Sequence, residues 1–383
     1  MSRAPRPLGD APSLIRELQT HPSLRSLRAS PDWPALEPRL SSLLSTVRRY
    51  EPEAPPAPAS DRTRVMAVHW NVEHGNWYEQ VERALIDHPQ LRGADVLLFN
   101  EIDLGMARAA NRDVTADLAA ALGLHAIWAP LFLETTTGRD DDPRMAGTLA
   151  NQESLFGLAI LSRWPIGDVQ VLDLPSPMEI QFDLERMYGR HIALLAEIRR
   201  PGGPFVAVSV HLEVHRTRAD RARQMQVLME ALRSETRPVL LAGDFNSHTF
   251  DRGRWWDPLF GAAVLLGSPT AMVRRRLLYP DRGAGRERLF DALREANFEW
   301  NRFVDRAPTL QLRFDRLDEA RGLVQVFGPL WRAILGSAER RANLRLDWFA
   351  GRGWREGRGC TIRDLNGPGK ASDHAPIVGF FQS

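Results

Sequence analysis

The stretch VLLAGDFNS, residues 239–247, joins a run of apolar residues to a glycine, a carboxylate and an amide. The apolar run predicts a buried β-strand, and Gly243 allows a tight exit from it. Asp244 and Asn246 have the same parity, so an extended chain points both side chains the same way. A carboxylate beside an amide that can orient its partner is a candidate active-site pair, although the same letters also fit a plain strand-to-turn junction.

Other apolar runs of the sequence also have the length of strands. They are VMAVHW (65–70), DVLLFN (95–100), LAILS (158–162), HIALLAEI (191–198) and FVAVSVH (205–211). Such runs are typical of strands that are buried on at least one face. Polar groups lie at or near their ends and elsewhere in the chain, namely His69-Trp70-Asn71-Val72-Glu73, Asn100-Glu101, His211-Leu212-Glu213, Asp244-Phe245-Asn246, Asp347 and Asp373-His374. We expect them to converge on one rim of a sheet and form an active site.

Helical stretches alternate with these strands at 78–88, 112–122, 219–233 and 286–297. The alternation indicates an α/β domain, residues 61–383, in which helices cover sheets. Before this domain, apolar residues recur at helical spacing in 12–21 and 34–50. The segment ends at EPEAPPAPAS, residues 51–60, where the prolines cannot sustain a helix or a central strand. We therefore interpret residues 1–60 as a helical appendage with a proline-rich linker that is dispensable to the chemistry.

Composition excludes several other classes of protein. The chain has 383 residues, 43% hydrophobic and 26% charged, which is ordinary globular usage. The single cysteine, Cys360, rules out an intrachain disulfide and a multi-cysteine metal site. A net charge of +2 does not by itself imply a nucleic-acid partner. Because no apolar stretch has the length of a signal-peptide core or a bilayer span, we expect no membrane span and a cytoplasmic location.

Seven short blocks of the sequence, taken in order, resemble one known family. They are WNVEHG (70–75), LLFNEID (97–103), GLAILSRWPI (157–166), VSVHLE (208–213), LLAGDFNS (240–247), RLDWF (345–349) and SDHAPI (372–377). The ordered set is similar to the endonuclease/exonuclease/phosphatase family, which includes abasic endonucleases, deoxyribonucleases, neutral sphingomyelinases and inositol polyphosphate phosphatases. The resemblance covers residues 65–383. It implies a four-layer α/β sandwich, with two packed mixed β-sheets flanked by helices.

The same resemblance implies a metal site. Glu101 matches the principal ligand of the metal ion in this family, and Asn71, Glu73 and Asp373 match residues close to it. An all-oxygen set of this kind suits a hard cation such as Mg²⁺, which Mn²⁺ can replace. The cofactor expected from the sequence is therefore Mg²⁺.

Further roles implied by the resemblance concern the reacting water and the phosphate. Asp244 matches the carboxylate that activates the attacking water, and Asn246 matches the amide that positions the water or the phosphate. His374 matches the imidazole at the phosphate, and Asp347 matches the acid that holds the tautomer and charge of that imidazole. These roles agree with the chemistry, because phosphodiester cleavage needs an in-line water, a base and positive charge. His211 matches a second histidine of the deoxyribonuclease and sphingomyelinase branches, which abasic endonucleases lack.

Some positions near these blocks are less well defined. Family members place a Tyr or Arg at the phosphate, and Tyr188 and Arg190 are both candidates here. His74 lies in a glycine-flanked loop, and we interpret it as an exposed turn residue. The long segment 250–346 separates two of the blocks. It either shapes substrate choice or only pads the surface or makes an oligomer contact.

The sequence therefore predicts a Mg²⁺-dependent phosphoesterase that hydrolyses a phosphodiester by direct water attack. A nuclease is favoured, since arginines at 216–223 and 274–276 offer phosphate contacts and Trp255-Trp256 offers a stacking surface. A sphingomyelinase-like lipid phosphodiesterase and a soluble phosphate-ester phosphatase are the alternatives. A catalytically dead binding module is the non-enzyme alternative, and the complete set of site residues argues against it. The expected partner is a phosphate ester, with nucleic acid among the options, and the oligomeric state stays open.

Overall fold

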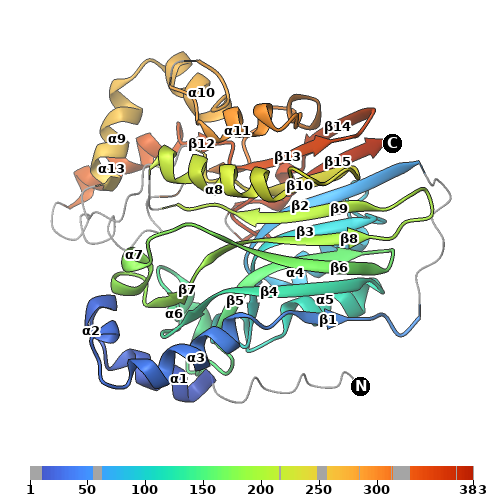
Figure 1. Cartoon of the computed structure of the whole chain (residues 1–383). Coiled ribbons are helices and arrows are strands. Elements are labelled where there is room, and N and C mark those ends of the chain that lie inside the picture. The colour runs from blue at the N-terminus through green and yellow to red at the C-terminus, as the bar shows by residue number, and fades with distance from the viewer. Residues whose placement is uncertain are drawn as a thin grey trace.

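Two β-sheets face each other and helices cover their outer sides in the computed structural model (Figure 1). The structure describes residues 11–54, 63–214, 217–247, 257–283, 285–311, 313, 328–367 and 369–382. Among the helices of these residues, none is long and apolar enough to cross a membrane.

Each sheet mixes parallel and antiparallel neighbours. Across the eight-stranded first sheet the order is β1 (Arg48–Tyr50), β4 (His125–Glu134), β5 (Leu155–Ser162), β3 (Val96–Leu104), β2 (Arg64–His74), β15 (Ile377–Gln382) and β14 (Glu356–Thr361), and β7 (Met187–Gly189) also pairs with β4. Across the five-stranded second sheet it is β13 (Asp347–Arg352), β10 (Val239–Asp244), β9 (Phe205–His211), β8 (His191–Ile198) and β6 (Ile166–Leu174). The parallel pairs are β2 with β3 and β9 with β10.

Alternation of side chains along each strand builds the core between the sheets. In β2, Val65 and Ala67 belong to the cluster that fills the space between the two sheets, whereas Val68 and Trp70 pack with the outer helices. Successive side chains of a strand point to opposite faces, so a strand that is covered on both sides reads as a continuous apolar run. This is why the apolar runs of the sequence coincide with β2, β3, β5, β8, β9 and β10.

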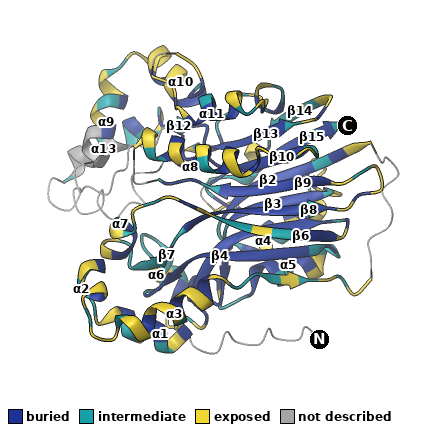
Figure 2. Cartoon of the chain, in the orientation of Figure 1, coloured by how far each residue is buried: buried dark blue, intermediate teal, exposed yellow. Residues whose placement is uncertain are grey.

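Helices on both outer faces complete four layers, as the sequence resemblance implied. The first sheet is covered by α4 (Tyr78–Asp87) and α5 (Val114–Leu122), and the second by α8 (Arg218–Ala231) and α11 (Leu289–Glu295). Figure 2 shows buried strands between helices that expose one side. The shorter helices are α6 (Asp142–Ala146), α7 (Glu179–Asp183), η1 (Ala107–Ala109), η2 (Asn301–Phe303) and η4 (Arg363–Leu365).

The N-terminal helices pack against this sandwich and share its apolar cluster. Helices α1 (Ala11–Gln19), α2 (Leu24–Arg28) and α3 (Trp33–Leu44) bury their leucines in the same cluster as the outer face of the first sheet. The helix expected over 34–50 ends at Leu44, and β1 then pairs with β4. The boundary at residue 60 therefore does not separate two structural units, because the apolar faces of these helices are covered by the sheet; residues 55–62 lie outside the described part.

Removing apolar volume from the N-terminal helices should accordingly destabilise the whole domain. Leu40 of α3 is fully buried, so Leu40→Ala is expected to lower the free energy of unfolding by about 2–5 kcal/mol, the usual cost of a buried leucine. Thermal unfolding followed by circular dichroism measures the change. Glu37→Ala, at an exposed position of the same helix, is the control; equal Tm values for the two variants would contradict the shared core.

Part of the long segment between Asn246 and Asp347 forms a small helical layer with its own apolar cluster, whereas α11 of the same segment packs on the second sheet. It contains α9 (Asp257–Gly267), α10 (Thr270–Leu278), α13 (Pro329–Glu339) and the short pair β11 (Leu310–Gln311) and β12 (Asn343–Leu344). The backbone oxygen of Thr309 accepts a 2.7 Å hydrogen bond from the Ala375 amide. This contact places β11 beside the SDHAP block. Trp255-Trp256 and residues 314–327 lie outside the described part of the chain.

Candidate active site

The inward-facing parity of five strands gathers polar side chains at one end of the space between the sheets. Asp244 of β10 lies opposite His211 of β9 on one side and Asp347 of β13 on the other. Asn71 of β2, in the facing sheet, reaches Asp244 with its amide, and the Asn71 Nδ2 to Asp244 Oδ2 distance is 3.4 Å. The convergence predicted from the polar strand ends therefore occurs, and it involves both sheets.

Asp347 holds two imidazoles, one from each side. Its Oδ2 lies 2.8 Å from His374 Nδ1, and its Oδ1 lies 2.9 Å from His69 Nε2. Burial disfavours charge on His374 and Asp347, but their mutual attraction outweighs it. The pKa of Asp347 is consequently held well below its usual range and the pKa of His374 well above. His374 is thus kept as an imidazolium that can face a phosphate oxygen.

Asp244 is placed to take a proton. Its Oδ2 lies 3.8 Å from His374 Nε2 and 3.8 Å from His211 Nε2. Its Oδ1 accepts a 2.8 Å hydrogen bond from the backbone N–H of Asn246. Burial, with the neighbouring charge of Asp347, raises the pKa of Asp244 to about 7. Burial also lowers the pKa of His211 to about 4, so that imidazole is neutral at pH 7. A carboxylate with a pKa near the working pH is suited to general-base catalysis.

Asn246 lies in a turn that leads its side chain back into the site. Its φ is 47°, in the left-handed region that asparagine tolerates better than most residues. The side-chain Nδ2 donates a 2.8 Å hydrogen bond to the Leu212 carbonyl, at the end of β9. This bond fixes the amide beside Asp244, so Asn246 is in place to orient a water or a phosphate.

Bulges in β2 and β3 aim the oxygen donors. The register shifts between Asn71 and His74 and again between Phe99 and Ile102, and Glu73 and Glu101 adopt φ values of 46° and 50° there. Bulges often re-aim side chains next to active sites, and strained residues persist where the surroundings hold them.

The carboxylates expected to bind metal share one cavity. Glu73, Glu101 and Asp373 all line a hollow of about 230 Å³. Asn71 Nδ2 donates to Glu101 Oε1 over 2.9 Å, and the Asp373 amide donates to Glu73 Oε2 over 3.0 Å. Although burial opposes it, the positive charge of His74 and the hydrogen bond from Asn71 lower the pKa of Glu101 to about 2. The four residues therefore present hard oxygen donors that suit a divalent cation, and the carboxylate of Glu101 is ionised.

A second group of donors lies close together in the same site. Asp244, Asp347 and His374 each offer one ligand atom, and these atoms lie within 4.8 Å of one another. Two of the three are already joined in the Asp347–His374 hydrogen bond. These three residues could hold a metal ion. The hydrogen bond between Asp347 and His374 favours an acid–base role for the three residues instead.

The two candidates for a phosphate contact, Tyr188 of β7 and Arg190, do not reach the site. The Tyr188 ring packs edge-on against Trp33 and Phe182. Arg190 donates to Asp173 Oδ1 over 2.5 Å and to the Leu44 carbonyl over 3.0 Å. The expectation for both residues is not supported, because the side chains are engaged with the N-terminal helices and with β6.

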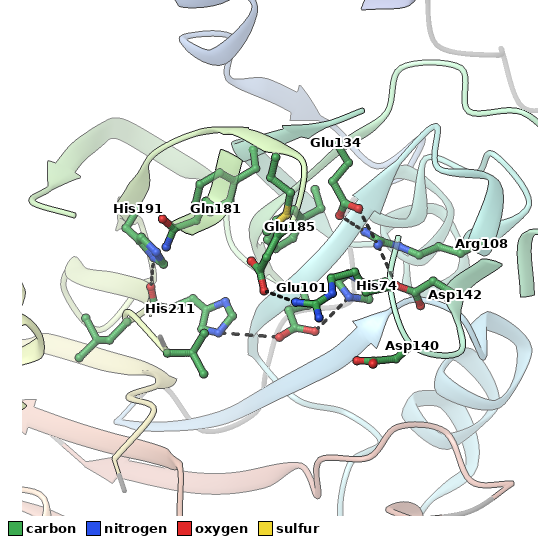
Figure 3. A pocket seen from close by; sticks show the side chains of 16 residues that line it. His74, Glu101, Arg108, Glu134, Asp140, Asp142, Gln181, Glu185, His191 and His211 are labelled. Atoms are coloured by element: carbon green, nitrogen blue, oxygen red, sulfur yellow. Dashed lines mark hydrogen bonds and ion pairs between the residues drawn. The ribbon is translucent and has the colours of Figure 1, made fainter. Parts of the chain in front are cut away.

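One histidine of the site was misread in the sequence, and a second was expected in the site but given no role of its own. His74 is not an exposed turn residue: its Nε2 lies 3.5 Å from Glu101 Oε2 and its Nδ1 3.6 Å from Asp103 Oδ1 (Figure 3). Burial and Arg108 oppose a positive charge there, yet Glu101 and Asp103 raise the pKa of His74 to about 10. His69 is fully buried between Asp347 and the Leu98 carbonyl. His69 and Asn71 are two residues apart in β2, so the sequence indicated that both side chains point to the same face of the strand.

His69 should act by holding Asp347. We expect His69→Gln to lower kcat about 10-fold, the lower range for losing a partner that orients a site residue. Steady-state kinetics measures the loss, with circular dichroism to verify folding. His88→Gln, at a histidine of the surface, is the control, and unchanged kcat in His69→Gln would contradict the role.

A family comparison agrees with this geometry. The model of the endonuclease/exonuclease/phosphatase family matches residues 68–374. The structure of an endonuclease/exonuclease/phosphatase from Beutenbergia cavernae DSM 12333 is similar with a TM-score of 0.51 and 16% identity, covering 84% of this chain and 72% of that one. For the Bacteroides vulgatus endonuclease/exonuclease/phosphatase the TM-score is 0.48 and the identity 13%, covering 84% of this chain and 99% of that one. No curated protein matches the chain.

Fold and site together define a metal-dependent phosphoric ester hydrolase built on a four-layer α/β sandwich. The chain belongs to the endonuclease/exonuclease/phosphatase family, since the family model spans most of its length.

Proposed function

We propose that the protein is a Mg²⁺-dependent phosphodiesterase that hydrolyses its substrate by direct attack of water. The observation that carries the proposal is Asp244, a buried carboxylate with a pKa of about 7, flanked by the His374–Asp347 pair. Asp244 accepts the proton of the attacking water, and Asn246 holds that water in line. His374, kept positive by Asp347, stabilises the charge that develops on the phosphate oxygens.

The metal site supports Mg²⁺ as the cofactor. Asn71, Glu73, Glu101 and Asp373 would hold the ion through oxygen atoms, as hard cations require. When bound, the ion supplies positive charge to the phosphate in the transition state.

Of the arginines that the sequence offered as phosphate contacts, Arg223, Arg274, Arg275 and Arg276 are exposed, whereas two others are engaged within the protein. The Arg221 guanidinium is buried and donates to Glu287 Oε1 over 2.9 Å, so it cannot contact a phosphate. Arg218 is exposed, but it donates to the Gly285 carbonyl over 2.6 Å. Arg216 and Trp255-Trp256 lie outside the described residues. We favour a phosphodiester with small substituents over DNA or RNA because a cavity of about 230 Å³ beside Glu101 and His211 is lined by more carboxylates than guanidinium groups.

The proposal predicts turnover of a generic diester. Purified protein with Mg²⁺ is expected to release p-nitrophenolate from bis-p-nitrophenyl phosphate, and p-nitrophenyl phosphate, a monoester, should react more slowly. Absorbance of p-nitrophenolate measures both rates. Plasmid DNA under the same conditions tests the nuclease alternative, and a folded protein that hydrolyses none of these esters would contradict the proposed function.

A further inference from the structure

A second cavity adjoins the candidate active site and shares His74, Glu101 and His211 with it. It has a volume of about 230 Å³ and is walled by Glu101 and His211 on the side of the catalytic residues. On the other side lie Gln181 of α7, Glu185 and His191 (Figure 3). A group attached to a phosphate beside Asp244 would have this cavity within reach, because Glu101 and His211 belong to both spaces.

Negative charge prevails on the described lining of this cavity. Its carboxylates are Glu101, Glu134, Asp140, Asp142 and Glu185, and its cations are Arg108, Arg139 and His74, whose pKa is raised to about 10. Arg139 Nη1 lies 3.6 Å from Glu185 Oε1. With Glu101 assigned to the metal ion, four carboxylates remain against these three cations.

The positive charge of Arg108 does not make this cavity attractive to an anionic ligand. It is almost fully buried and makes paired hydrogen bonds to Asp103, at 2.7 and 2.9 Å. Its Nη1 also donates to Glu134 over 3.0 Å and to Asp142 over 3.1 Å. A cation that already has three carboxylate partners adds no net positive charge to the cavity.

Gln181 brings a buried acceptor to the same cavity. Its Nε2 donates to the two oxygens of Glu213, at 3.1 and 2.9 Å. Since an ionised carboxylate only accepts, these bonds fix which end of the amide is the nitrogen. The remaining atom, Gln181 Oε1, is buried and has no hydrogen-bond partner among the described residues. Buried acceptors without a partner are rare, and a ligand donor would satisfy this one.

Aromatic rings form an apolar part of the wall. Phe132 and Phe156 stack with their centroids 5.5 Å apart and their planes 16° apart, and both line the cavity. Because the rings stack on each other, they add apolar surface that suits the methylene groups of a short alkyl chain. An aminoethyl group therefore finds carboxylates, a carbonyl without a hydrogen-bond partner among the described residues and apolar rings on one lining.

We propose that this cavity binds an ester substituent of the substrate that carries a protonated primary amine, as in an aminoethyl phosphodiester. This inference rests on the proposed phosphodiesterase function and names its substrate class. A polynucleotide would place further phosphates near the carboxylates, which repel them. A quaternary ammonium group would satisfy the charge but has no N–H for Gln181 Oε1.

Substrates with one common leaving group test the cavity. The set is p-nitrophenyl aminoethyl phosphate, p-nitrophenyl ethyl phosphate, p-nitrophenyl phosphorylcholine and thymidine p-nitrophenyl phosphate. We expect kcat/KM to be highest for the aminoethyl ester, about 10-fold above the ethyl ester, the scale of one hydrogen bond to a charged group. Equal values for the aminoethyl and ethyl esters would overturn the inference while leaving the phosphodiesterase intact.

Two variants separate the acceptor from the charge. Gln181→Met keeps the length of the side chain and removes the carbonyl, so the advantage of the aminoethyl ester over the ethyl ester should fall about 10-fold. Glu185→Gln leaves Gln181 and Glu213 in place and should reduce the same advantage. Glu179→Gln, at an exposed position of the same helix, is the matched control and should keep it. An unchanged advantage in both cavity variants would overturn the inference.

A binding measurement makes the test independent of turnover. Phosphoethanolamine and ethyl phosphate are titrated into the Mg²⁺-loaded protein by isothermal titration calorimetry. We expect phosphoethanolamine to bind about 10-fold more tightly to the wild type, and the difference to shrink in Gln181→Met. Selective binding without hydrolysis of any ester would contradict the proposed function and uphold the cavity, whereas equal affinities would overturn the cavity.

Discussion

Replacing Asp244 by Asn is expected to lower kcat by at least about 10²-fold, the usual contribution of a positioned general base. The amide has nearly the same shape but cannot accept the proton of the attacking water. Burial next to Asp347 raises the pKa of Asp244 to about 7. The neutral side chain therefore removes an unfavourable charge, and Tm should stay the same or rise. Stopped assays of bis-p-nitrophenyl phosphate hydrolysis and thermal unfolding measure the two effects.

The pH dependence of the wild type is a second readout of the same residue. Below its pKa Asp244 is protonated and cannot act as a base, so kcat should rise with pH. A divalent cation at Glu101 would lower this pKa by its positive charge, which places the rising limb at or below about pH 7. Asp168→Asn, at an exposed position of β6, is the control. Near-normal kcat in Asp244→Asn would show that another group takes the proton.

The layers of the fold were predictable because buried strands leave a simple pattern. β8 and β9 have the bounds that their apolar runs predicted, 191–198 and 205–211. The polar residues at the ends of β2, β3, β9 and β10 were recognisable because each closes an apolar run. Strand parity, which the sequence displays directly, brings Asn71, His211 and Asp244 together. The placement of Glu73 and Glu101 depends instead on the bulges of β2 and β3.

Pairing between distant segments was not predictable in the same way. β1 has only three residues and its partner is β4, so nothing local marks Arg48–Tyr50 as a strand. Tyr188 and Arg190 lie in a stretch that family members use for phosphate contacts, but here the N-terminal helices cover it. A contact made by another part of the chain thus decided the role of both side chains.

Bulges explain the misreading of His74. A regular strand would have continued the alternation of β2 beyond Asn71, whereas the register shift turns His74 toward Glu101 and Asp103. The left-handed φ of 66° at His74 has no sequence signal other than the following glycine. Local strain of this kind is visible only in the folded chain.

Replacing Glu101 by Gln should remove most of the activity through loss of the metal ion. The amide keeps the size of the side chain but loses the negative charge that a divalent cation requires. We expect kcat at fixed, low Mg²⁺ to fall by at least about 10²-fold, the scale of electrostatic stabilisation in hydrolytic sites. Saturating Mn²⁺ should restore part of it. Calorimetric titration of Mg²⁺ should show weaker binding, which distinguishes a lost ligand from a misfolded site.

Chelation of the metal ion in the wild-type protein tests the same metal dependence. Excess chelator is expected to abolish hydrolysis of bis-p-nitrophenyl phosphate, and added Mg²⁺ or Mn²⁺ should restore it, because His374 alone cannot neutralise the charge that develops on the phosphate. Glu79→Gln, a change in an ion pair of the surface, controls for the general effect of removing a carboxylate. Full activity in excess chelator would rule out metal dependence. An unchanged affinity for the metal ion in Glu101→Gln would show that other residues bind the ion. The neighbouring group Asp244, Asp347 and His374 is then the next set to test, since its ligand atoms already lie within 4.8 Å of one another.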